Sequence, residues 1–374
     1  MTVKPLSLVF LGLSISSSWG NGHATNYRAL LKALAARGHE VTFLERDCPW
    51  YASNRDLPDP GYCRLEFYES LEDLQRRHAR TLADADAVVV GSYVPEGAAV
   101  LRFALATARG LVGFYDIDTP ITLAKLATGD AEYLTPEMIP DLDFYLSFTG
   151  GPVLQRLQRD YGARLPVAFY CMVDPELYRA TRESRRWDLG YIGTYAPDRQ
   201  PALERLLLEP ARRLPECRFV VAGPQYPEDI DWPANVERIE HLPPGEHARF
   251  YSRSRFTLNI TRSEMVKAGW SPSVRLFEAA ACDTAILTDR WPGLDSILPE
   301  GRALLAAESA DDVVAALTRI SPARAAEIAA CGRQIVLTHH TGGRRAEELE
   351  VVLARAGAAS VGNQSREMAH AFPR

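Results

Sequence analysis

The chain alternates short, wholly apolar segments with amphipathic ones, and this alternation restricts the fold more than any other feature. Residues 6–13 form a continuous apolar run, which is followed by helical spacing over 25–37 and a terminating Gly38. The same strand-like pattern recurs in three later segments, 41–44, 87–91 and 111–115. Continuous apolar runs indicate strands covered on both faces, and helices between them favour a parallel sheet with right-handed crossovers.

The second half of the chain repeats this scheme. Its strand-like runs are 189–193, 218–223, 235–239, 256–260 and 285–288. Helical spacing lies between them, at 202–214, 245–252 and 275–282, and an Ala-rich helical region follows residue 311. At about 150 residues per domain, 374 residues predict two domains.

We therefore expect an α/β protein with two Rossmann-like, doubly wound domains that face each other across a cleft. The first domain is predicted for residues 1–170 and the second for 171–345, with the Pro-bounded segment 165–175 as the hinge. Residues 346–374 are predicted to form a C-terminal helix that packs back on the first domain, followed by a frayed tail.

Composition excludes several classes of protein. Acidic residues outnumber basic ones 48 to 42, a net charge of −6, which argues against a nucleic-acid partner. No run approaches the roughly 20 apolar residues of a membrane span. The apolar start could imitate a secretory signal, but a buried strand fits it better. Six scattered cysteines without metal-ligand spacing fit reduced thiols, so we expect a cytoplasmic protein.

The loop after the first predicted strand, residues 14–25, is a possible anion site. Its backbone amides and the helix start behind it could hold a phosphate. The dinucleotide motif G-x-G-x-x-G is incomplete because Thr25 stands at its third glycine, although Glu45 lies where a ribose-binding acid would. The incomplete motif therefore disfavours an NAD site. His23 could contact a substrate or be an ordinary surface histidine.

Two carboxylates, Asp116 and Asp118, directly follow the predicted strand 111–115. Three interpretations stay open at this point. The pair could bind a divalent metal. One of them could orient an acceptor or act as a general base. Alternatively, Asp118 or Thr119 could cap the next helix.

In the second half, small and cationic residues follow the predicted strands, an arrangement that suits a diphosphate. Gly193 and Arg199 follow one strand, and Arg262 and Lys267 follow another. Ser273 is a plausible N-cap that would place backbone amides near an anion.

Glu278 lies in an otherwise apolar helical segment, where a carboxylate is costly without a partner. Ribose hydroxyls could be that partner, and a salt bridge to Arg275 is the structural alternative.

Several segments together resemble the CgeB-like proteins, which are glycosyltransferases of GT-B architecture. The segments that carry this resemblance are 189–195, 219–224, 259–262 and 272–282, with weaker likeness at 116–120 and 148–151. The resemblance implies a nucleotide-sugar donor held mainly by the second domain, and no metal or other cofactor.

By the same resemblance, Glu278 would bind the donor ribose and Gly223 would lie near the base. Gly193, Arg199, Arg262 and Lys267 would lie near the diphosphate or the sugar, and Ser273 and Arg275 belong to the same donor-binding segment. Retaining relatives often carry a second glutamate eight positions earlier, where this chain has Trp270.

The leading interpretation is a glycosyltransferase that moves a sugar from a nucleotide-activated donor to an acceptor hydroxyl in the cleft. Asp118, His23 or Asp116 would serve as the catalytic group. The alternatives are a non-catalytic nucleotide- or sugar-binding protein of spore coat or envelope assembly, a nucleotide-sugar epimerase and, last, a nicotinamide oxidoreductase.

Overall fold

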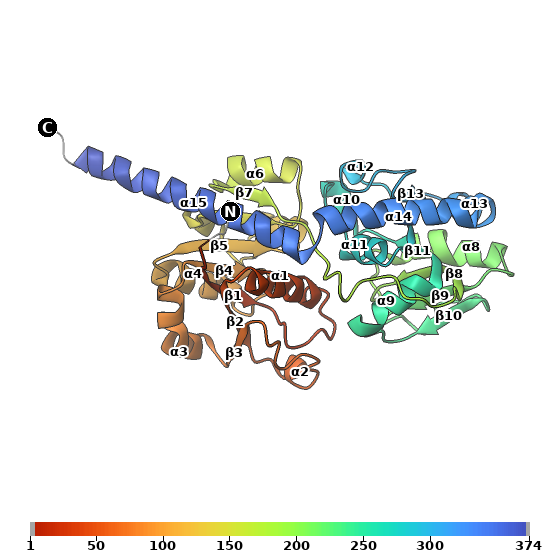
Figure 1. The fold of residues 1–374 in the computed structure, drawn as a ribbon, viewed down its shortest axis with the longest axis horizontal. Helices are drawn as coiled ribbons and strands as arrows, with labels where there is room; N and C mark the ends of the chain where they lie inside the picture. The colour runs from red at the N-terminus through yellow and green to blue at the C-terminus, as the bar shows by residue number, and fades with distance from the viewer. Residues whose placement is uncertain (1–3, 372–374) are drawn as a thin grey trace. The chain divides into compact units, whose positions relative to one another are not determined.

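A computed structural model of the protein describes residues 4–371. The chain divides into two compact units (Figure 1). The first contains the chain up to Tyr170 and again from Gly342, and the second is Cys171–Thr341. The polypeptide therefore passes between the units twice.

The first unit is built on a seven-stranded parallel sheet with the strand order β3-β2-β1-β4-β5-β6-β7. Its strands are β1 (Ser7–Gly12), β2 (Glu40–Arg46), β3 (Arg64–Tyr68), β4 (Ala87–Gly91), β5 (Leu111–Asp116), β6 (Phe144–Ser147) and β7 (Pro166–Ala168). The strand order reverses between the neighbours β1 and β4. Right-handed crossovers therefore place α1 and α4 on opposite faces of the sheet.

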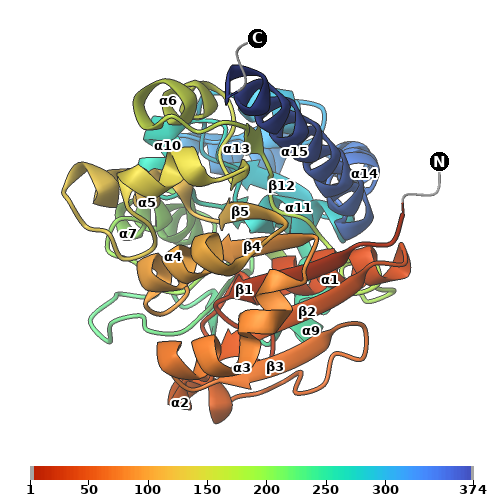
Figure 2. The ribbon, with the colours of Figure 1, turned by 90° about the vertical axis from the view of Figure 1, so that its left-hand side faces the viewer.

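The helices of the first unit are α1 (Ala24–Ala36), α2 (Pro49–Ala52), α3 (Leu71–Ala83), α4 (Gly97–Thr107), α5 (Thr119–Ala127), the 3₁₀ helix η1 (Pro136–Asp141), α6 (Pro152–Tyr161) and α15 (Gly342–Ala371). Helices α3 and α4 pack together (Figure 2), and α15 packs on α1. At Gly342 the two backbones are so close that a Cβ atom would lie 2.3 Å from the carbonyl oxygen of Ala29. Further along, Glu350 accepts hydrogen bonds from Arg37 at 2.6 and 2.7 Å.

The second unit has a six-stranded parallel sheet with the order β10-β9-β8-β11-β12-β13. Its strands are β8 (Trp187–Ile192), β9 (Phe219–Ala222), β10 (Val236–Ile239), β11 (Ser254–Asn259), β12 (Ala285–Thr288) and β13 (Leu305–Ala306). Here the order reverses between β8 and β11. In doubly wound sheets, ligands bind beyond the carboxyl ends of the strands at such a reversal.

The helices of the second unit are α7 (Gln200–Leu203), α8 (Glu209–Arg213), α9 (Pro244–Arg253), α10 (Ser263–Ala268), α11 (Val274–Ala281), α12 (Leu294–Ile297), α13 (Ala310–Arg319) and α14 (Pro322–His339). A π turn, η2 (Glu204–Leu208), joins α7 to α8, so the predicted helix 202–214 is not a regular α-helix. Pro210 has no backbone N–H to continue the α-helical bonding, which gives the irregularity a physical reason.

The predicted strands are confirmed, but β3, β6 and β13 escaped prediction. Segment 165–175, expected as a hinge, also contains the edge strand β7. Helix α15 continues to Ala371, whereas the last fifteen or so residues of the chain were expected to fray.

All six cysteines are free thiols. Within residues 4–371, no helix has the length and apolar character that crossing a bilayer requires.

Candidate functional site

In the second unit, the loops that follow β8 and β9 touch through their backbones. Gly193 donates its N–H to the Ala222 carbonyl at 2.8 Å, and Gly223 donates to Ile239 at 2.8 Å. Gly223 has φ = +146°, and a Cβ atom there would lie 2.0 Å from the Gly193 carbonyl oxygen. The structure therefore brings these two predicted site glycines together, and Gly223 is required for the close approach.

Arg275 lies against the same loops. Its guanidinium donates to the carbonyl oxygens of Ile192 at 3.0 Å and Ile260 at 3.4 Å, at the ends of β8 and β11. Its Nε atom donates to Ser273 Oγ at 3.2 Å. Ser273 is the N-cap of α11, as predicted, and accepts from the Arg275 N–H at 3.4 Å. These contacts fix a cation beside the first turn of α11.

Arg199 is the second cation at this edge. It donates to the Thr194 carbonyl at 2.6 Å, while its buried Nε has no hydrogen-bond partner. Burial lowers the pKa of Arg199, and the positive charge of Arg275 lowers it further. Among the residues that the structure describes, neither arginine has a carboxylate within ion-pair distance. Two cations that lie near a helix N-terminus and form no ion pair within the described chain favour binding of an anion.

The other two predicted cations lie on the short helix after β11. Arg262 is the N-cap residue of α10, and Lys267 is exposed in its last turn. Glu264 stands between them on the same helix. Its pKa is lowered by a hydrogen bond from Ser263 and, to a lesser degree, by the two cations. Part of the positive charge of α10 is thus already balanced.

Glu278 is only 4% exposed and has partners within the protein. Tyr251 of α9 donates to its Oε2 atom at 3.1 Å, and His247 Nδ1 lies 3.8 Å from the same oxygen. Burial, and then the Glu278 charge, raise the pKa of Tyr251 well above its ordinary value. The expected alternative, a salt bridge to Arg275, is wrong because that side chain turns to strand-end carbonyls. Burial of Glu278 therefore does not by itself require a bound ribose.

A polar network that sequence reasoning missed fixes the end of β11. Asp289 accepts the Thr261 N–H at 3.1 Å and its hydroxyl at 2.9 Å. Burial raises the pKa of Asp289, although these hydrogen bonds oppose the shift. Asn259 donates to Thr288 at 2.9 Å, and its buried Oδ1 atom accepts no hydrogen bond within the described chain. Asp289 directly follows β12, which is the signal that could have identified it.

In the first unit, the loop after β1 is occupied by the protein's own carboxylate. Glu45 is 1% exposed and accepts from the Ile15 and Ser16 N–H groups at 2.7 and 3.0 Å. It also accepts from the hydroxyls of Ser14 and Ser16 at 2.8 and 2.5 Å. The Ile15 and Ser16 amides are therefore already engaged and do not hold a phosphate in this arrangement. Glu45 itself was considered as a ribose-binding acid, and its carboxylate is fully engaged by this loop instead.

His23, Tyr93 and Asp118 come together from the loops that follow β1, β4 and β5. The Tyr93 hydroxyl donates to Asp118 Oδ2 at 2.6 Å, and the rings of His23 and Tyr93 stack at 5.5 Å. Tyr93 has φ = +67°, a strained value for a non-glycine residue and one that is often found at functional sites.

Asp116 has different surroundings from its neighbour. It is fully buried and accepts from the hydroxyls of Tyr145 at 2.5 Å and Thr122 at 2.8 Å. Burial raises its pKa to about 6. Asp118 is the N-cap residue of α5, but its side chain makes no capping hydrogen bond. Within the described part of the chain, no group of three or more His, Cys, Asp or Glu side chains is arranged to hold a metal ion.

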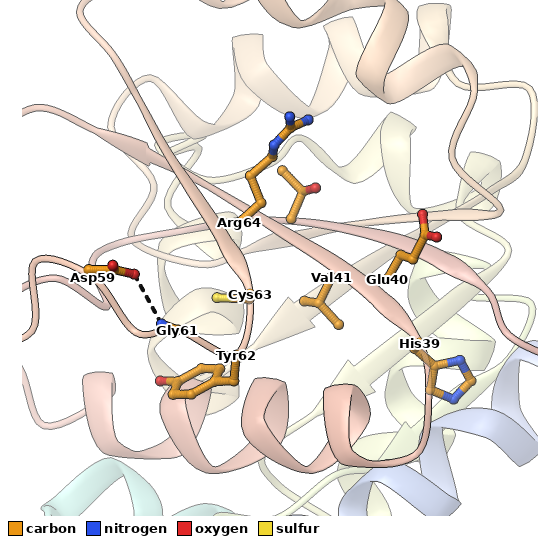
Figure 3. A pocket seen from close by; sticks show the side chains of 9 residues that line it. His39, Glu40, Val41, Asp59, Gly61, Tyr62, Cys63 and Arg64 are labelled. Atoms are coloured by element: carbon orange, nitrogen blue, oxygen red, sulfur yellow. Dashed lines mark hydrogen bonds between the residues drawn. The ribbon is translucent and has the colours of Figure 1, made fainter.

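A pocket of about 660 Å³ lies at the amino-terminal end of the first sheet's strands, opposite the end that carries Asp118 (Figure 3). It is lined by residues at the amino ends of β2 and β3, among them Glu40, Arg64 and Tyr62. Burial raises the pKa of the Cys63 thiol in its wall to about 12. None of the predicted site residues lines this pocket.

Comparison with known families identifies one match. Residues 199–351, which include most of the second unit, match the family described as glycosyl transferase-like. A comparison of the sequence with curated proteins gives no match.

Solved structures resemble the whole chain. Sucrose-phosphate synthase from Thermosynechococcus elongatus has a TM-score of 0.67 and 14% identity, over 95% of this chain and 100% of that one. HepE of Anabaena, in complex with UDP and glucose, has a TM-score of 0.68 and 12% identity, over 94% and 100%. An α-glucosyltransferase in complex with UDP-glucose and abasic-site DNA has a TM-score of 0.69 and 12% identity, again over 94% and 100%. These likenesses confirm the predicted GT-B fold class.

Proposed function

We propose that the protein is a glycosyltransferase that uses a nucleotide-activated sugar. The observation that carries this proposal is the pair Arg199 and Arg275. The two arginines lie where β8, β11 and α11 meet, and both belong to the segment that matches the glycosyl transferase-like family. Structural neighbours in complex with UDP, glucose or UDP-glucose support a nucleotide sugar as the donor.

The chemistry of transfer explains why cations are needed there. The bond between the anomeric carbon and the donor phosphate breaks, and the acceptor oxygen forms the new bond to that carbon. Negative charge builds on the departing diphosphate, and fixed guanidiniums and helix amides stabilise it. In the proposal, Arg199, Arg275 and the first turn of α11 supply this stabilisation, without a metal or other cofactor. Glu278 would exchange its contact with Tyr251 for the ribose hydroxyls.

The first unit would hold the acceptor in this proposal. In an inverting reaction, Asp118 or His23 would take the proton from the acceptor hydroxyl, and Tyr93 would orient the carboxylate. In a retaining reaction, the departing phosphate would take that proton. The closer relationship to CgeB-like proteins and a cytoplasmic location belong to the same proposal.

Calorimetric titration with UDP, GDP, dTDP, CMP and ADP tests the donor site. We expect one nucleotide to bind, and Arg199→Gln to weaken it by roughly 10- to 100-fold, the effect of losing one charge-assisted contact. Arg324→Gln is the matched control, because Arg324 is an exposed arginine of the same unit that pairs with Glu327. Failure of all five nucleotides to bind at millimolar concentration would refute the proposal.

A non-catalytic nucleotide- or sugar-binding protein is the second candidate, and Trp270 favours it. The position eight before Glu278 carries this indole instead of a carboxylate. The backbone N–H of Trp270 donates to the Pro292 carbonyl at 2.6 Å, and the Trp270 ring lies 2.4 Å from where a Cβ atom of Gly293 would be. Proton NMR of UDP-glucose with the protein separates the candidates. Release of glucose or transfer above background supports the enzyme, and tight binding without turnover supports the second candidate.

A further inference from the structure

Large apolar side chains of the described chain are mostly buried, and two tryptophans are conspicuous exceptions. Trp19 is 49% exposed and Trp50 is 53% exposed. Trp19 lies in the loop after β1, and Trp50 lies in α2, directly after β2. The two indoles therefore lie beyond the carboxyl ends of neighbouring strands, at the same edge of the sheet as Asp118.

Hydrogen bonds fix the loops that present these indoles. Ser17 donates its hydroxyl to the Asn54 carbonyl at 2.7 Å, and the Leu57 N–H donates to Ser16 at 2.9 Å. Ser18 donates both its N–H and its hydroxyl to Asp56, each at 2.8 Å. The exposure of Trp19 and Trp50 is therefore built into an ordered surface, where rigid aromatic side chains favour ligand binding.

The polar groups beside the indoles indicate the chemistry of a ligand. The Asp56 side chain is 42% exposed and pairs with Arg28 at 2.8 Å. Hydrogen bonds from Arg28 and Ser18 lower the pKa of Asp56 to about 2, against the opposing effect of burial, so it stays ionised. Asp47 of the same segment pairs with Arg55 at 2.7 Å. The charges of Arg28 and Arg55 are thus both balanced by carboxylates, which disfavours the phosphates of a nucleic acid.

A sugar ring matches such a surface. The negative face of an indole attracts the polarised C–H groups of a pyranose face, and carboxylates accept hydrogen bonds from the hydroxyls at its edge. We propose that Trp19 and Trp50 form a carbohydrate-binding site and that the acceptor is itself a carbohydrate. The acceptor role rests on the proposed function, whereas carbohydrate binding does not depend on it.

Calorimetric titration of the full chain with maltotriose, cellotriose and triacetylchitotriose tests the site. We expect at least one trisaccharide to bind, and Trp19→Ala and Trp50→Ala each to weaken it about tenfold. Trp19→Phe and Trp50→Phe should keep most of the affinity, because they keep an aromatic face. Val351→Ala, at a 59%-exposed apolar position of α15, is the control and should leave binding unchanged.

The possible results separate this proposal from the proposed function. If a nucleotide binds but no trisaccharide does, the carbohydrate site is refuted and the donor proposal stands. If a trisaccharide binds with equal affinity to the alanine variants, the Trp19–Trp50 assignment is wrong. Binding of single-stranded oligothymidylate in place of the sugars also overturns it. If a trisaccharide binds through the indoles but no nucleotide binds, the donor proposal fails alone.

Discussion

Glu45 provides the sharpest test of how the first unit is held together. Its carboxylate accepts four hydrogen bonds, two from backbone N–H groups and two from serine hydroxyls, all in the loop after β1. Replacing it with alanine removes every one of these acceptors. Replacing it with glutamine keeps one carbonyl oxygen for the N–H groups, and the hydroxyls can rotate to accept from the new amide.

The two substitutions should differ in magnitude. Glu45→Ala leaves four buried donors without acceptors. Because each unsatisfied buried donor typically costs about 1–3 kcal/mol, we expect a loss of at least about 3–5 kcal/mol. Glu45→Gln loses mainly the charge assistance, so we expect a cost of about 1–2 kcal/mol. Glu40→Ala is the matched control because Glu40 is an exposed glutamate in the same strand. Its effect should stay within about 0.5 kcal/mol.

Urea unfolding gives the free-energy differences, and hydrogen exchange of residues 14–18 gives the local effect. We expect the Ile15 and Ser16 amides to lose protection in Glu45→Ala and to keep much of it in Glu45→Gln. An alanine variant that costs less than about 1 kcal/mol, with both amides still protected, would refute the reasoning. It would mean that the loop keeps its conformation without this carboxylate.

Three further changes have expected outcomes. Gly223→Ala forces a Cβ atom against a backbone carbonyl, so we expect thermal unfolding to show a loss of about 2–4 kcal/mol in stability. Gly245→Ala, where the space is open, is the nearly neutral control. Burial raises the pKa of Asp116 from 3.8 to about 6, so its ionisation lowers the free energy of unfolding by roughly 2–3 kcal/mol as pH rises through that window. Asp116→Asn should abolish this fall, which urea unfolding at several pH values measures. The pH dependence from Glu350 has the opposite sign. Arg37 lowers the pKa of Glu350 below 4.5, so its contribution to stability is present above that pH and is lost as pH falls. Glu350→Gln should therefore flatten the acid limb of the plot of unfolding free energy against pH. Unchanged acid limbs in both variants would contradict the two assignments.

Much of the fold was predictable because the central strands are buried on both faces. The residues of β4 are all buried, and their apolar run is unmistakable. Strand β3, by contrast, is an edge strand in which one residue is exposed, three are half-buried and one is buried, and β7 has three residues and begins with a proline. Short strands of this kind are defined by their neighbours in the sheet, which periodicity along the chain does not reveal.

Site residues were predictable only where their place in the sequence, after a strand or at the start of a helix, determines their role. Gly193, Gly223 and Ser273 follow strands or begin a helix, so their roles in the local structure could be anticipated. The partners of buried carboxylates are different, because they come from distant segments. Tyr251 reaches Glu278 from 27 positions away, and Tyr93 reaches Asp118 from 25.

The double passage of the chain between the units has a consequence for biosynthesis. Cys171–Thr341 is continuous, so the second unit is complete before the ribosome has made α15. The first unit is synthesised earlier but lacks α15, and the surface of α1 that α15 covers stays open until that helix has been made. A stop codon at Gly342 should therefore yield a nascent chain whose earlier-made half is the one that chaperones and proteases recognise.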